Sequence, residues 1–99
     1  MKRICSMIIA LVGVTAATET WAQQVRFDNP RIEGAIVDWC STWAQNCGAG
    51  GANLYCQRRG YSQAVNWGTF NPGRTWVIGS DRLCEGDFCV GFSHVTCTH

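Results

Sequence analysis

Apolar residues follow one another almost without interruption near the start of the chain, over residues 4–17. This run begins after Lys2-Arg3 and is followed by a short stretch that ends at Ala22. A basic start, an apolar stretch of about 7–15 residues and a small residue before the cut are the three parts of a secretory signal peptide. A membrane anchor needs about 20 apolar residues, more than this run supplies. We therefore predict a signal peptide over residues 1–22, cleaved after Ala22, and a mature protein that is not held in a membrane.

One stretch beyond the signal, residues 52–60, carries a helical pattern. The positions that recur at the spacing of one helix face are Ala52, Tyr55, Cys56 and Arg59. Arg58 suits the negative C-terminal end of a helix, and Gly60 suits the left-handed residue that follows many helices. The glycine-rich residues 48–51 are predicted to form a loop before this helix. Cys56 is expected on the buried face, where it can tie the helix to a sheet.

The rest of the chain reads as strands and turns. Residues 61–67 alternate between polar and apolar, and residues 75–78 are β-branched and aromatic, which predicts two strands. Turns are predicted at residues 71–73 and 85–87. A last strand over residues 88–98 follows. Strict alternation in it places Cys89, Val95 and Cys97 on one face and Phe88, Val90, Phe92 and His94 on the other, unless a bulge at Gly91 changes the faces.

These elements predict an α+β fold: a small disulfide-rich domain with one short helix packed on a three- or four-stranded antiparallel sheet. Ninety-nine residues leave room for one domain only. Residues 23–36 are polar around Asn29-Pro30, so we expect an extended N-terminal arm. Residues 34–37, where the arm meets the domain, can add an edge strand. Residues 37–99 then form the disulfide-stapled domain.

The charge of the mature chain argues against two classes of partner. Residues 23–99 contain six arginines, six acidic residues and no lysine, so their net charge is zero. Binding to nucleic acid or to anionic lipid depends on clustered positive charge. We therefore expect no nucleic-acid partner and no membrane partner.

Six cysteines remain after the predicted cleavage: Cys40, Cys47, Cys56, Cys84, Cys89 and Cys97. An even number in a short exported chain is typical of a disulfide framework, and the sequence has no Cys-x-x-Cys pair that would favour zinc. A domain of this size buries little apolar surface and commonly needs such staples. Fifteen pairings are possible for six cysteines. We favour Cys40–Cys47, Cys56–Cys97 and Cys84–Cys89, which closes two local loops and ties the helix to the last strand.

Catalytic chemistry finds little support in the residues. The even cysteine count argues against a free thiol nucleophile, and for a serine hydrolase the mature chain offers only His94 and the terminal His99 as histidines. No Gly-x-Ser-x-Gly motif is present. Asp81, Glu85 and Asp87 cluster near one cysteine pair, but their spacing fits no known calcium loop, and acids are common in turns. We predict a protein that is not an enzyme and that carries neither cofactor nor metal.

Aromatic residues are the more informative feature. The mature chain holds four tryptophans, and exposed tryptophan often anchors a protein partner or stacks on a sugar ring. Trp39 and Trp43 are candidate binding residues, together with Arg58 and Arg59. We therefore expect a secreted or periplasmic binding module for carbohydrate or a protein partner. The alternative is a small effector such as an inhibitor or toxin, in which residues 48–51 or 71–73 would form a protruding loop.

The cysteines and their neighbours also resemble a known kind of domain. The similar segments are Val37-Asp38-Trp39-Cys40, Cys47-Gly48, residues 52–56 with Gly60-Tyr61, residues 74–80, and residues 89–97. They are similar to a small secreted six-cysteine domain family of bacteria and plants that has no settled activity. The resemblance implies that the six cysteines and Gly60-Tyr61 are structural, and it transfers no catalytic residue. A shorter likeness to scavenger-receptor and lectin-like modules is an analogy only.

Overall fold

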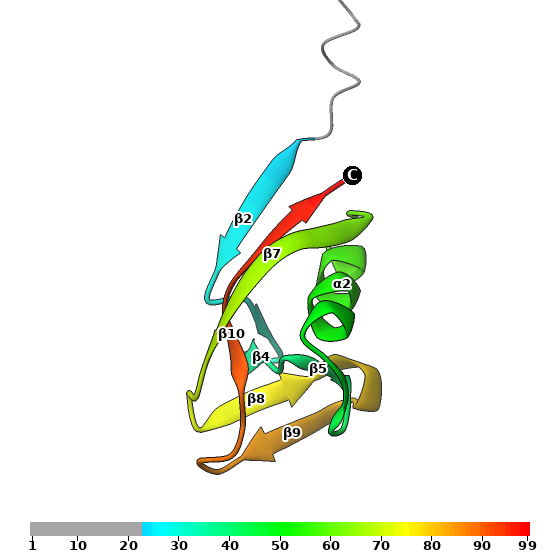
Figure 1. The fold of residues 1–99 in the computed structure, drawn as a ribbon. Helices are drawn as coiled ribbons and strands as arrows, with labels where there is room; N and C mark the ends of the chain where they lie inside the picture. The colour runs from blue at the N-terminus through cyan, green and yellow to red at the C-terminus, as the bar shows by residue number, and fades with distance from the viewer. Residues whose placement is uncertain (1–22) are drawn as a thin grey trace, which may run out of the picture.

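The computed structural model describes residues 23–99, and the predicted signal peptide lies outside the described residues (Figure 1). The elements in chain order are β2 (Gln24–Asp28), β3 (Arg31–Ile32), β4 (Ala35–Val37), β5 (Cys40–Thr42), β6 (Gln45–Cys47), α2 (Ala49–Arg58), β7 (Gln63–Phe70), β8 (Arg74–Val77), the 3-10 turn η2 (Ile78–Ser80), β9 (Arg82–Glu85) and β10 (Gly91–Thr98). One α-helix packs against small sheets within this range. The predicted α+β, disulfide-rich fold class is confirmed.

The strands form three sheets. One has the order β2-β10-β7, the second has the order β3-β4-β8-β9, and the third is the hairpin β5-β6. All pairings are antiparallel except β4 with β8. That parallel pair departs from the all-antiparallel prediction. It is possible because the chain passes through β5, β6, α2 and β7 before β8, and such a long crossover lets β8 return in the direction of β4.

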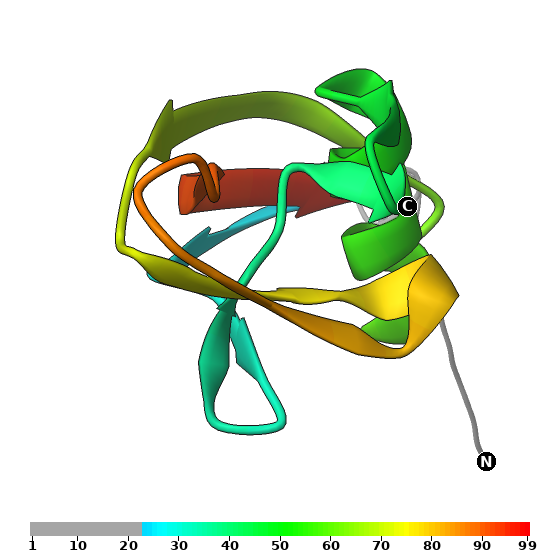
Figure 2. The same cartoon turned by 90° about the horizontal axis from the view of Figure 1, so that it is seen from below.

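Residues 23–36, the expected extended arm, form β2, β3 and most of β4, which are paired within the fold. β2 lies along β10, with Phe27 opposite Val95. β4 is buried at all three positions between β3 and β8, so the expectation that residues 34–37 form an edge strand is wrong. β3 lies at this edge of the sheet instead, and Figure 2 shows the β3–β4 hairpin projecting from the rest of the fold.

Helix α2 begins three residues before its predicted start and ends where the sequence indicates. The expected loop over residues 48–51 is wrong, since Ala49–Gly51 form the first turn. A Cβ atom on Gly51 would collide with the carbonyl oxygen of Trp39, so glycine lets the helix lie directly on the backbone just before β5. Gly60 has φ +90°, and its N–H donates to the Gln57 carbonyl at 3.1 Å. Tyr61 N–H donates to the Cys56 carbonyl at 2.9 Å, which completes a Schellman motif.

The main core lies between α2 and β10. Its buried members are Val37, Ala52, Tyr55, Cys56, Ile78, Phe92, Val95 and Cys97. The predicted separation of Phe92 from Val95 and Cys97 onto opposite faces is wrong, because the β10–β7 register shifts between Phe92 and His94. The irregularity therefore falls after Phe92 rather than at Gly91. The last strand also begins at Gly91, so Cys89 lies outside it.

All three favoured disulfides are confirmed. Cys40–Cys47 links the two strands of the β5–β6 hairpin, and Cys84–Cys89 closes a short loop after β9. Cys56–Cys97 joins α2 to β10 and spans 41 residues of sequence. Both of its cysteines are fully buried, so this bridge crosses the centre of the core.

Candidate binding site

A pocket of about 330 Å³ opens between two disulfide-stapled segments, the β5–β6 hairpin and the loop that Cys84–Cys89 closes. Its lining residues are Asp38, Trp39, Cys40, Trp43, Ala44, Cys47, Cys84 and Phe88. Most of them are aromatic, aliphatic or disulfide-bonded. Asp38 is the one charged residue in the lining. The pocket therefore offers mainly apolar surface, with walls held by two covalent bridges.

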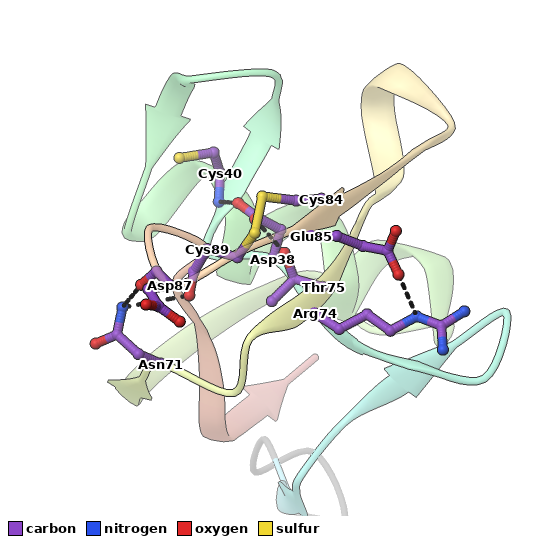
Figure 3. The surroundings of a disulfide bond; sticks show 9 residues. All are labelled: Asp38, Cys40, Asn71, Arg74, Thr75, Cys84, Glu85, Asp87 and Cys89. Carbon is purple, nitrogen blue, oxygen red and sulfur yellow. Dashed lines mark hydrogen bonds and ion pairs between the residues drawn. A yellow bond between two sulfur atoms is a disulfide. The ribbon is translucent and has the colours of Figure 1, made fainter.

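Asp38 fixes the floor of this pocket. Its side chain is buried, with one carboxylate oxygen accepting the Cys40 N–H at 2.9 Å and the other accepting the Thr75 hydroxyl (Figure 3). The bond to Cys40, two residues on, makes a local turn at the entry to β5. Asp38 N–H also donates to the Trp76 carbonyl at 2.9 Å. Because both oxygens have partners inside the protein, Asp38 positions the segment that carries Trp39.

Trp39 and Trp43 lie in the same pocket, as their pairing in sequence suggested. Both are half-buried, Trp39 against the main core and Trp43 against a small cluster of Val77, Cys84 and Cys89. The N–H of Trp43 donates to Ser80 Oγ at 2.8 Å, and the Arg82 guanidinium lies 4.0 Å from the centroid of its ring. A cation over the ring face holds the indole in place. Each tryptophan thus has a fixed inner part and an open part toward the pocket.

Phe88 is the residue that sequence reasoning missed. It lines the pocket with 71% of its surface exposed, the highest exposure among the large hydrophobic residues of the described chain. A Cβ atom on Gly86, whose φ is +134°, would lie 2.7 Å from the Phe88 ring, so this glycine allows the ring to rest on the backbone. The sequence signal for Phe88 is an aromatic residue among the four residues between Cys84 and Cys89.

The loop that presents Phe88 is braced by the turn before β8. The Asn71 side-chain amide donates to the carbonyls of Asp87 and Cys89, both at 3.3 Å (Figure 3). Gly86 N–H donates to the Gly73 carbonyl at 2.9 Å. The loop over residues 84–89 is therefore held by a disulfide and by three hydrogen bonds from outside its own closed ring.

Arg58 and Arg59 lie away from the pocket. Arg58 is the last residue of α2 and Arg59 is its C-cap, whereas Gly51, in the first turn of the helix, contacts the Trp39 backbone. The Arg59 guanidinium lies 5.0 Å from the centroid of the Phe27 ring. Burial raises the pKa of Tyr55 nearby, and the charge of Arg59 offsets part of that rise. The structure thus brings two of the four predicted binding residues together and places the two arginines elsewhere.

Comparison of the chain with protein-family models, with curated proteins and with solved structures found no match. The resemblance to a secreted six-cysteine family stays a hypothesis.

Three other features of residues 23–99 bear on function: metal ligands, membrane-spanning helices and a serine–histidine pair. No three histidine, cysteine, aspartate or glutamate side chains in this range lie close enough together to hold a metal ion. Within the same range, no helix has the length and apolarity needed to cross a bilayer. Ser93 Oγ and His94 Nδ1 lie 3.3 Å apart, but Asp28, opposite His94 in the sheet, has a carboxylate oxygen bonded to Arg26 Nε at 2.8 Å. Among the described residues, no hydrogen bond links Asp28 to His94.

Proposed function

We propose that the protein is a non-catalytic binding module, and that it recognises a protein partner through the pocket between the β5–β6 hairpin and the Cys84–Cys89 loop. The observation that carries the proposal is Phe88, which stands 71% exposed beside Trp39 and Trp43. Exposed aromatic residues on a rigid support are the usual centres of binding energy in protein interfaces. The braced loop lowers the cost of binding, since little of it has to be ordered when a partner arrives.

A protein partner fits this pocket better than a carbohydrate. Sugar recognition needs polar groups that are free to bond hydroxyls, in addition to an aromatic platform. Asp38 is the charged lining residue, and both of its carboxylate oxygens already accept hydrogen bonds from Cys40 and Thr75. The remaining lining is apolar, and it suits an aromatic or aliphatic side chain.

The alternative, a small inhibitor or toxin, draws support from a specific feature. The loop over residues 84–89 projects an exposed Phe88 from a ring closed by a disulfide. Such a rigid projection can enter a cleft on another protein. Of the two loops predicted for such a protein, residues 49–51 are helical, and the turn at residues 71–73 braces the projecting loop. The binding-module hypothesis and the inhibitor or toxin hypothesis therefore assign recognition to the same residues.

We further propose that the protein acts outside the cytoplasm, either secreted or in a periplasm. Disulfides persist in oxidising compartments and are rare in the cytosol, and three bridges in so short a chain are consistent with an extracellular setting. The signal-like residues 1–22 give the route of export.

Export and oxidation can be tested together by the intact mass of the exported protein. We expect a chain that begins at Gln23, about 6 Da lighter than its fully reduced form because each bridge removes two hydrogens. Alkylation without reduction should add nothing to this mass. An uncut chain, or native thiols that react, would contradict the proposed compartment.

The binding proposal predicts that the purified, oxidised protein selects peptides from a phage-displayed random library, and that these share an aromatic or large aliphatic residue. The variant Phe88→Ala should lower the affinity for the tightest-binding peptide by about 30-fold, which is the loss expected when an interface anchor is removed. Arg58→Ala, an exposed change at the far end of α2, is the control and should leave the affinity unchanged.

Three outcomes would overturn this proposal. One is the failure of any peptide to be enriched. Another is equal binding by the wild-type protein and Phe88→Ala. The third is binding of chito- or cello-oligosaccharides at the pocket in place of peptides, which would identify the ligand as carbohydrate.

A further inference from the structure

Exposed apolar side chains in the described residues are concentrated on strand β7. Of the four large hydrophobic residues that are exposed, three belong to β7: Val65 at 40%, Trp67 at 36% and Phe70 at 38%. The fourth is Phe88 of the pocket. None of the β7 residues lines that pocket. This strand therefore exposes three large apolar side chains that the proposed function does not use.

β7 also has an edge with no neighbouring strand. It pairs with β10 on one side, and it is the last strand of its sheet. Near its start, Asn53 of α2 accepts the Ala64 N–H at 2.8 Å, so the helix covers that end of the edge. The ladder is irregular at Val65, which has no partner on β10. From Asn66 to Phe70 the edge has no strand beside it within the described chain.

The other sheet edges differ from β7 in charge or length. β2 carries Arg26 and Asp28, and β9 carries Arg82 and Glu85. β3 has two residues, and the strands of the β5–β6 hairpin have three each. Charge and shortness are the usual means of preventing strands from pairing with another chain. β7 has eight residues and neither charge nor proline, so it lacks these protections.

We infer that residues 66–70 of β7 pair antiparallel with the same residues of a second copy of this chain. A strand that pairs antiparallel with its own copy about a two-fold axis is self-complementary. With the axis at Gly68, Trp67 of each copy lies opposite Thr69 of the other, and no charged side chains face one another. The six arginines and six acids of residues 23–99 also leave no net charge to keep two copies apart.

Pairing of this kind stops at two copies. The joined sheet has the order β2-β10-β7-β7-β10-β2, so its outer edges are the two β2 strands. Arg26 and Asp28 lie on those edges and are bonded to each other at 2.8 Å. Charged edges resist further strand addition. A second copy therefore fits the β7 edge without starting a fibre.

The test is the molar mass of the purified, oxidised protein by sedimentation equilibrium from micromolar to millimolar concentration. We expect a reversible monomer–dimer equilibrium. Thr69→Lys places a charge near its symmetry mate and should weaken the dimer by about tenfold or more. Gln24→Lys makes a matched change of charge on β2 and should leave the dimer unchanged. A monomer at all concentrations, or a dimer that responds to Gln24→Lys and not to Thr69→Lys, would overturn the inference.

Hydrogen exchange on the wild-type protein keeps the inference testable if Thr69→Lys does not fold. The amides of residues 66–70 that point away from β10 should gain protection as protein concentration rises, while those of β2 should not. Exchange in residues 66–70 that is independent of concentration would overturn the inference. Peptide binding at Phe88 and pairing at β7 are separate readouts, so each proposal can fail without the other.

Discussion

Replacing Cys56 and Cys97 together by alanine is expected to lower the free energy of unfolding by about 4 kcal/mol. The bridge closes a loop of 41 residues and joins α2 to β10 through the centre of the core. The longer the closed loop, the more the bridge restricts the unfolded chain. A domain of this size has a total stability of about 4–12 kcal/mol, so this change consumes a large share of it. Urea denaturation of the oxidised variant measures the loss.

The matched control is the double substitution of Cys84 and Cys89 by alanine. This bridge has a sequence separation of 5, so the same reasoning predicts a loss of about 2 kcal/mol. Its main consequence should be a looser Phe88 and weaker peptide binding. Equal losses from the two pairs would contradict the view that Cys56–Cys97 is the principal staple of the fold.

The second large effect is expected from Phe92→Ala, which should destabilise the protein by about 3–5 kcal/mol. Phe92 has no exposed surface and packs in the main core. Removing its ring leaves a cavity between α2 and β10 that the neighbouring side chains cannot fill completely. Thermal or urea unfolding followed by circular dichroism gives the difference from wild type.

Phe88→Ala is the same chemical change at an exposed position, and it separates the two roles of phenylalanine in this protein. We expect it to alter stability by less than about 0.5 kcal/mol, while peptide binding falls. If Phe88→Ala were as destabilising as Phe92→Ala, the ring would be part of the folding core. Phe88 would then line the pocket because the fold needs its ring, and not because a partner binds it.

The parts of the fold that depend on neighbouring residues could be predicted from the sequence. Gly60 ends α2 because the left-handed cap needs only the residues beside it. The two short disulfides follow from cysteines that are already close in sequence. The parallel pairing of β4 with β8 could not be found this way, since it depends on the path of the chain between them.

Two errors in the predicted elements have a physical cause in tertiary contacts. Glycine is a poor helix former, so residues 49–51 were expected in a loop, yet only glycine fits at position 51 against the Trp39 carbonyl. The faces of β10 were misassigned because a register shift after Phe92 changes the alternation. Neither the contact between Gly51 and Trp39 nor the register shift between β10 and β7 can be recognised from the local sequence.

Two of the four binding residues predicted from the sequence lie in the candidate site. Trp39 and Trp43 flank Cys40, and the hairpin that this cysteine closes places both in one pocket. Arg58 and Arg59 were grouped with them by sequence alone, but the direction of α2 carries them to its opposite end. The sequence predicts Phe88 at the start of the last strand, so its exposed position in the loop over residues 84–89 is missed.

Chemical-shift mapping with a selected peptide is the most direct test of the claim that this pocket binds a partner. On isotope-labelled protein, the account predicts shifts in the indole N–H signals of Trp39 and Trp43 and in the amides of residues 84–89. The amides of Arg58 and Arg59 should not move. Shifts centred on the C-terminal end of α2, with both indole signals unchanged, would contradict it.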